Sequence, residues 1–214
     1  MERSEDRYLR LCMRKVYLFG EINNERAEKF IAQLHELFEE SDEPVTVFIN
    51  SCGGSVTDAL AIYDVLQNAP CEVYTVGLGK VHSSAITVLL SAPRSSRASY
   101  PNTEFMSHDI SWKSDGPRAF LKDRVDQLER TVKQLLAVYT RDTRLSREQA
   151  QSMFFMDMSD HYFNAEEAME MGFVSSIITR DIDHLRGPAC VSMPSVEVST
   201  TPGEEQNAVN SSLD

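Results

Sequence analysis

Apolar residues in the first half of the chain form two kinds of pattern that follow one another in turn. Short continuous apolar runs bounded by turn residues are typical of strands buried in a parallel sheet. Between these runs, apolar side chains recur at steps of three and four residues, which is typical of a helix with one buried face. The elements expected here are strands at 15–19, 45–50 and 71–77 and helices at 25–40, 56–66 and 83–91.

This alternation of strand and helix predicts the fold class. Strand–helix units that follow one another at short intervals are typical of an α/β fold, in which helices join parallel strands. Further strands are expected at 104–108 and 173–178. The patterns S-x-x-Q at 146–149 and N-x-x-E at 164–167 have the spacing of capping boxes, so they predict the starts of two short helices.

A long helix is expected at 117–141, where apolar residues recur in alternating steps of four and three. Such a narrow heptad seam fits two arrangements. The helix packs along the body of its own domain, or it projects and joins one subunit to another. The seam consists of Leu121, Val125, Leu128, Val132, Leu135 and Tyr139.

Length and charge limit the organisation and the function. The chain has 214 residues and a formal net charge of −12, which argues against general binding to nucleic acid. We expect one domain at 15–180 after a short N-terminal segment at 1–14. Residues 181–214 carry one basic and six acidic residues and many Ser, Thr and Pro, so they are expected to form a disordered acidic tail.

The sequence gives no sign of a membrane, a secretion signal or a metal. No apolar run reaches the roughly 18 residues needed to span a bilayer. Charges interrupt the N-terminal segment throughout, so a cytoplasmic location is expected. The four cysteines and five histidines lack metal-ligand spacing, and the cysteines are expected to be reduced. No cofactor is expected in this chain.

Two glycine-rich phosphate-binding motifs fail on inspection. Gly77-x-Gly79 follows an expected strand, but the third glycine of a dinucleotide fingerprint would fall at His82. Gly79-Lys80 resembles part of a P-loop, yet Val81 stands where a serine or threonine must bind magnesium. Nucleotide binding is therefore not predicted.

Two other segments carry residues suited to acyl chemistry. Gly53 and Gly54 lie between a strand and a helix, where exposed backbone N–H groups either form a simple tight turn or stabilise an oxyanion. Ser83 lies where small residues lead from a strand into an apolar helix, so it is either a helix cap or a nucleophile. A nucleophile needs a base and an orienting acid, and the candidates are His108 and an acid near 157–160.

At these positions the chain resembles the ClpP family, the proteolytic subunit of the Clp protease. The resemblance covers roughly 15–180. It rests on I-N-S-x-G-G-S-V at 49–56, A-I-Y-D-V-L-Q at 61–67 and N-A-E-E-A-x-x-x-G-F-V at 164–174. In the family the serine of G-x-A-A-S-M-G and the histidine of M-I-H-Q-P are 25 residues apart, as are Ser83 and His108 here.

The resemblance implies a serine endopeptidase that cleaves peptides and unfolded proteins. Ser83 is the implied nucleophile, His108 the base and Asp160 the orienting acid. Backbone N–H groups of Gly54 and Ser84 would form the oxyanion hole.

The resemblance also implies an architecture and partners. The fold would be crotonase-like, a spiral of βαβ units with a protruding handle helix, here at 117–141. Copies of the chain would form heptameric rings, with two rings stacked around a closed chamber. ATP would act only through a separate partner unfoldase of the AAA+ class, although the short segment at 1–14 argues against that pairing.

Several departures from the family keep alternatives open. Cys52 replaces a proline, His82 an alanine, and Asp109-Ile110 a Gln-Pro pair. Ser84, with His82 close in sequence, is an alternative nucleophile, and His82 either plays no part or perturbs the pKa of His108. The alternative functions are a catalytically inactive ring subunit and a crotonase-type acyl-CoA enzyme.

Overall fold

The structure of the protein is a computed structural model that describes residues 14–110, 115–155 and 159–179. The chain divides into two units, Met1–Thr179 and Arg180–Asp214. All described residues belong to the first unit. The expected acidic tail at 181–214 and nearly all of the N-terminal segment at 1–14 lie outside the described residues.

Strands and helices alternate through the first three strand–helix units, as the sequence predicts. The elements are β1 (Lys15–Phe19), α2 (Asn24–Glu40), β2 (Val45–Ser51), α3 (Val56–Gln67), β3 (Val73–His82), α4 (Ser84–Leu89), a 3-10 turn (Arg94–Ser96), β4 (Arg97–Ser99), β5 (Glu104–Ser107), α5 (Arg118–Asp142), α6 (Arg147–Phe154), β6 (His161–Phe163), α7 (Ala165–Met171) and β7 (Ser176–Ile177).

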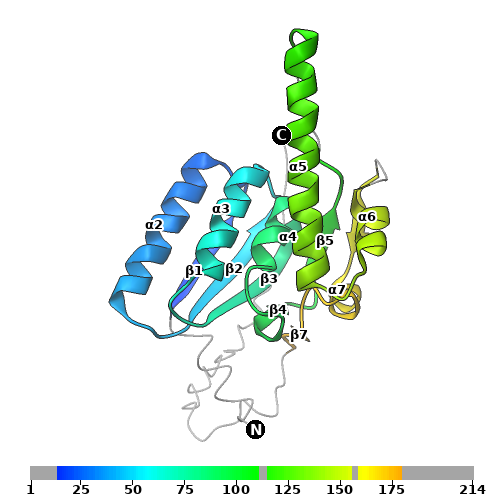
Figure 1. The fold of residues 1–214 in the computed structure, drawn as a ribbon. Coiled ribbons are helices and arrows are strands. Elements are labelled where there is room, and N and C mark those ends of the chain that lie inside the picture. The colour runs from blue at the N-terminus through cyan, green and yellow to red at the C-terminus, as the bar shows by residue number, and fades with distance from the viewer. Residues whose placement is uncertain (1–13, 111–114, 156–158, 180–214) are drawn as a thin grey trace, which may run out of the picture. The chain divides into compact units, whose positions relative to one another are not determined.

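A single sheet with a branch at β3 organises these elements (Figure 1). The main path runs β1-β2-β3-β4-β7, and all of its neighbours are parallel. The first half of β3 pairs with β4 at Thr75–Gly77. The second half pairs in parallel with β5 at Lys80–His82, and β5 pairs antiparallel with β6. Strand β3 therefore connects the main sheet to a smaller three-stranded layer.

The length of β3 corrects the prediction that this strand ends at 77. It continues to His82 because Gly79, with φ +67°, turns the chain onto a new neighbour without ending the extended conformation. Strands β4 and β6 were not predicted, and both are short and contain polar residues. The final strand is shorter than the expected 173–178. Short polar strands carry little alternating pattern, so sequence periodicity did not reveal them.

The predicted starts of two short helices are confirmed. Ser146 and Gln149 form a complete capping box at α6, and Asn164 and Glu167 form another at α7. Helix α7 ends at Gly172, which adopts the left-handed conformation with φ +82°. Local side-chain chemistry thus fixes where both helices begin.

Helix α5 projects from the rest of its unit over its N-terminal half (Figure 1). Its buried residues all lie near its C-terminal end: Leu135, Leu136, Val138 and Tyr139. Phe120 and Val125, nearer the other end, are each 42% exposed. The predicted seam is therefore buried only in its last part, and packing along the whole body, one of the two expected arrangements, is wrong for this chain.

A buried arginine joins the ends of two helices to β4. Arg97 is 2% exposed, and its guanidinium donates hydrogen bonds to the carbonyls of Leu90, Ala92 and Asp142. Leu90 caps α4 and Asp142 ends α5, so the arginine satisfies carbonyl groups that helix termini leave unpaired. Burial lowers the pKa of Arg97 to about 10, which still leaves it charged at neutral pH.

The described helices include none that combines the length and the apolar character needed to cross a membrane.

The smaller layer depends on aromatic packing behind it, which gives a stability prediction. Phe105 of β5 is fully buried and stacks on Phe163 of β6 with ring centroids 5.3 Å apart. Replacing Phe105→Ala leaves a cavity and should lower the free energy of unfolding by about 3–5 kcal/mol. The matched control Phe105→Leu should cost less than about 1.5 kcal/mol. Urea unfolding at fixed protein concentration measures both, and equal losses would contradict this packing.

Candidate active site

The paired ends of β3 and β5 bring Ser83 and His108 to one place. The parallel register sets His82 opposite Met106, and the Ser83 N–H donates to the Met106 carbonyl at 2.7 Å. One step beyond the paired strands, Ser83 lies beside Ser107 and His108 follows immediately. Strand register therefore explains how two residues that are 25 apart in the sequence come to lie side by side.

Ser83 has a strained backbone and an unused hydroxyl. Its φ of 54° and ψ of −127° make it the one non-glycine residue with positive φ among the described residues. It occupies the cap position of α4, yet its side chain makes no cap hydrogen bond. By contrast, Ser55 and Ser146 cap their helices with side-chain hydrogen bonds. A simple capping role does not explain Ser83, and strain of this kind often occurs at functional sites.

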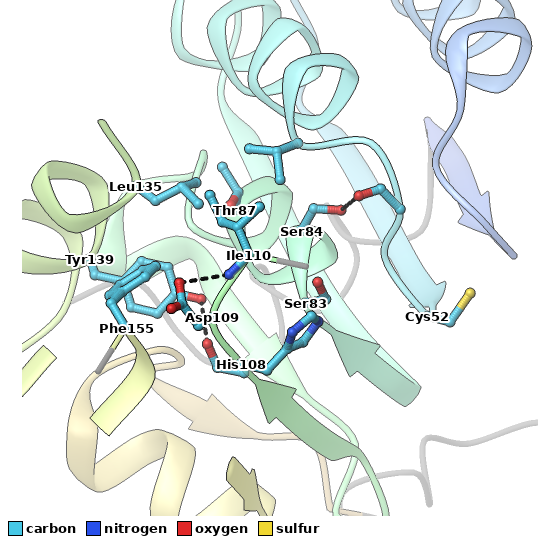
Figure 2. A pocket seen from close by; sticks show the side chains of 13 residues that line it. Cys52, Ser83, Ser84, Thr87, His108, Asp109, Ile110, Leu135, Tyr139 and Phe155 are labelled. Atoms are coloured by element: carbon cyan, nitrogen blue, oxygen red, sulfur yellow. Dashed lines mark hydrogen bonds between the residues drawn. The ribbon is translucent and has the colours of Figure 1, made fainter. Parts of the chain in front are cut away.

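Ser83 and His108 line the same cavity, which has a volume of about 270 Å³. Figure 2 shows the His108 ring beside Ser83, with Cys52 at one side and Tyr139 and Phe155 at the other. No hydrogen bond joins Ser83 and His108 in the described structure. The lining residues are Cys52, Gly54, Val56, Ser83, Ser84, Thr87, Ser107, His108, Asp109, Ile110, Leu135, Tyr139 and Phe155.

The Gly53–Gly54 turn lies against the backbone of the serine segment. A Cβ atom at Gly53 would come within 2.6 Å of the His82 carbonyl oxygen and 3.0 Å of the Ser84 nitrogen. A Cβ atom at Gly54 would come within 2.1 Å of the Ile22 carbonyl oxygen. Only glycine permits this approach without displacement of main chain, so the turn and Ser83 form one compact backbone arrangement.

Two backbone N–H groups remain available beside Ser83. The Gly54 N–H donates to no described residue, and Ser84 is the first residue of α4, where an N–H has no acceptor within the helix. The Ser84 hydroxyl, which is an alternative nucleophile from the sequence, is buried and donates to the Gly54 carbonyl at 3.2 Å. Because the Ser84 hydroxyl already makes this hydrogen bond, Ser83 is the better candidate for the nucleophile.

Tyr139 of α5 supports the end of β5 next to His108. Its hydroxyl shares a hydrogen bond of 3.1 Å with the Ser107 hydroxyl (Figure 2). Complete burial raises the pKa of Tyr139 to about 12, so it stays protonated at neutral pH. The sequence identified Tyr139 only as part of the helix seam, and its position behind the histidine carries no local sequence signal.

Asp160 reaches the site through its backbone but not through its side chain. The antiparallel register pairs Ser107 with His161, so one more step sets Asp160 opposite His108. The Asp160 side chain is exposed and lies outside the cavity lining. Its Oδ2 accepts a long hydrogen bond of 3.5 Å from the Tyr162 hydroxyl, and it has no hydrogen bond with His108 in the described part of the chain. The structure therefore brings together all predicted site residues except this carboxylate.

His82 lies beside Ser83 in sequence but does not line the cavity. Its Nε2 is 3.1 Å from the Glu104 carboxylate, and its ring packs edge-on against Tyr162 at 5.9 Å. Burial lowers the pKa of His82, and the negative charges of Glu104 and Asp160 oppose that shift. The alternative pair of Ser84 with His82 is not brought together, because the two side chains have different partners.

The described residues contain no group of three His, Cys, Asp or Glu side chains able to hold a metal ion. Cys52 and Cys71, the cysteines within the described range, are free thiols.

Comparison with known proteins decides the family. The family model described as Clp protease matches residues 1–181. The ATP-dependent Clp protease proteolytic subunit 2 of Thermobifida fusca is 34% identical over 184 residues, which are 85% of this chain and 88% of that protein. The corresponding subunit 2 of Pseudomonas aeruginosa is 30% identical over 171 residues, with coverage of 80% and 84%. This chain belongs to the Clp protease family.

A solved structure supports the same assignment for the fold. A ClpP1 mutant from Listeria monocytogenes aligns with a TM-score of 0.71 and 32% sequence identity, covering 83% of this chain and 98% of that one. The expected ClpP-type α/β fold is confirmed. The relatives are named as proteolytic subunits of the Clp protease, which supports a Clp protease-like function for this chain.

The strain at Ser83 gives a second stability prediction. Ser83→Gly should unfold with a higher free energy than Ser83→Ala, by about 1 kcal/mol, because glycine adopts this φ without strain. Both variants lack the hydroxyl, so their difference isolates the backbone. Chemical denaturation measures it, and a more stable alanine variant would contradict the strained geometry.

Proposed function

We propose that the chain is a serine endopeptidase in which Ser83, His108 and Asp160 act together. The Ser83 oxygen attacks the carbonyl carbon of a peptide bond, and His108 takes the proton from Ser83. The negative charge that forms on the carbonyl oxygen is stabilised by the N–H groups of Gly54 and Ser84. His108 then gives the proton to the leaving amine, and water releases the acyl group by the reverse sequence.

One observation carries the proposal. A serine with a strained backbone and an unused hydroxyl lies beside a histidine in the same cavity, and two unengaged N–H groups lie next to it. Residues from three separate stretches of the sequence form this arrangement. A structural turn alone requires neither the strain nor the histidine.

Asp160 can form a hydrogen bond with His108 if its side chain rotates toward the histidine. The register of β5 and β6 ends at Ser107 and His161, and one further step in the same register sets Asp160 opposite His108. Directly opposed residues on adjacent strands have Cβ atoms about 4.5–5.5 Å apart, within reach of a hydrogen bond between side chains. The carboxylate is held at present by the long contact with Tyr162, so rotation toward His108 breaks only a weak interaction.

We further propose that copies of the chain assemble into heptameric rings, and that α5 joins two such rings into a stack. The projecting half of this helix exposes Phe120 and Val125 together with the first part of the heptad seam. Apolar residues in such a projecting position are typical of subunit contacts. The relatives are named as parts of an ATP-dependent protease, so we propose that an AAA+ unfoldase partner supplies the ATP-driven step.

An inactive ring subunit is the second candidate function, because the Asp160 carboxylate lies apart from His108. Membership in the Clp protease family argues against the acyl-CoA enzyme. The two remaining candidates differ in whether Ser83 reacts.

The test is labelling by a fluorophosphonate probe, followed by mass spectrometry of the modified peptide. We expect the probe to modify Ser83 and Ser83→Ala to abolish both labelling and cleavage of a fluorogenic peptide. His108→Ala and Asp160→Asn should reduce labelling by at least about 100-fold and tenfold, since base and acid each contribute to the attack.

Ser84→Ala is the matched control, because it removes the neighbouring hydroxyl and keeps the backbone N–H. Labelling of this variant should continue. Labelling that survives Ser83→Ala would refute the assignment of the nucleophile. An assembled ring that neither reacts nor cleaves would establish the inactive subunit.

Assembly gives a separate prediction. The double variant Phe120→Glu and Val125→Glu should weaken association between subunits, because it places charge on the exposed apolar positions of α5. Light scattering at micromolar concentration should show a large particle for the unaltered chain and smaller species for the variant. A monomeric unaltered chain would contradict the ring proposal.

A further inference from the structure

The face of the small layer that carries His108 and Asp160 also carries a second histidine. Side chains alternate between the two faces of a strand, so residues in register at even spacing share one face. By this rule one face carries side chains from all three strands or from the residue next to a strand end. They are Lys80 and His82 on β3, Glu104 and His108 on β5 and just after it, and Tyr162 and Asp160 on β6 and just before it. His161 lies on the opposite face, against Phe154.

Contacts on this face link His82 to Asp160 in two steps. The His82 side chain is only 12% exposed, its ring packs on Tyr162, and its Nε2 lies 3.1 Å from Glu104. The Tyr162 hydroxyl in turn donates to Asp160. Asp160 is close enough for its charge to favour the protonated form of His82. The carboxylate expected to orient His108 is thus in the field of another imidazole.

We propose that His82 is a positioning residue for the catalytic acid, and that it competes with His108 for the Asp160 carboxylate. A protonated His82 attracts Asp160 and keeps it from His108, and a neutral His82 releases it. This inference rests on the proposed function for the role of Asp160 at His108. The contacts of Tyr162 with His82 and with Asp160 exist independently of catalysis.

The sign of the pH effect follows from the groups around His82. Glu104 and Asp160 favour its protonation, whereas burial and the neighbouring Lys80 oppose it. The net direction is a lowered pKa, so His82 is neutral at neutral pH and gains a proton on the acidic side of its ordinary range. Protonation of His108 also stops catalysis in acid, because a protonated base accepts no proton.

The kinetic test compares the acid limb of the pH profile of kcat/KM in the full chain and in His82→Ala. Two protonations in the unaltered chain should make log kcat/KM fall with a slope steeper than 1 over part of the acid limb, and the variant should fall with a slope of 1 throughout. The ratio of kcat/KM at the acidic end of the profile to that at pH 8 should rise in His82→Ala by up to about tenfold, the loss expected when Asp160 no longer orients His108. Glu104→Gln should move the steep part of the limb to lower pH. Equal slopes and ratios in all three proteins would overturn the proposal.

A second test measures the influence of Asp160 on the pKa of His82 and does not depend on catalysis. Histidine ring signals of the full-length, assembled protein, followed by NMR during a pH titration, give the pKa of His82 directly. Asp160→Asn should lower it, because the variant removes a carboxylate that favours the imidazolium. An unchanged pKa would overturn the proposal. If Ser83 proves unreactive, the proposed function fails while this titration still decides whether His82 holds Asp160.

Discussion

The divided pairing of β3 is the constraint on which the rest of the site depends. Its first half belongs to the main parallel sheet, and its second half is paired with β5. Because Gly79 turns the strand between the two, His82 ends in the smaller layer and Ser83 emerges at its edge. The same register brings His108 alongside, and the opposed strand β6 brings Asp160. Because one strand changes neighbours, the segments that carry Ser83, His108 and Asp160 come close together.

The glycine turn at 53–54 is the second element of this arrangement. The turn contributes no side chains. The absence of Cβ atoms lets its backbone lie directly against the neighbouring main chain. The strained backbone at Ser83 and the close approach of Gly53 both require a rigid surrounding, which fully buried residues such as Ile22 and Val81 provide. Strain at the site is therefore supported by the core beneath it.

Much of the fold was predictable because apolar periodicity and helix capping are local signals. The α/β class, the first three strand–helix units and both capping boxes follow from residues close together in the sequence. The continuation of β3 beyond Gly77 was not predictable, because only β5 shows that the segment is still a strand. Strands β4 and β6 were missed because their few residues are stabilised by neighbours that the sequence does not identify.

The candidate site divides in the same way. The serine and the histidine were predicted through family motifs, and strand register explains how they come to lie side by side. The direction of the Asp160 side chain, and its shared surface with His82 and Tyr162, depend on packing between strands and so lay beyond the sequence. His82, which departs from the family here, packs on the same tyrosine that holds the proposed catalytic acid.

The most direct measurement of the central claim is a crystal structure of the full chain after reaction with a fluorophosphonate. The account predicts a bond between phosphorus and Ser83 Oγ, with the phosphoryl oxygen within hydrogen-bonding distance of the N–H groups of Gly54 and Ser84. It also predicts a hydrogen bond between the Asp160 carboxylate and the His108 ring. A phosphoryl group on another residue, or an oxygen directed away from both N–H groups, would contradict it.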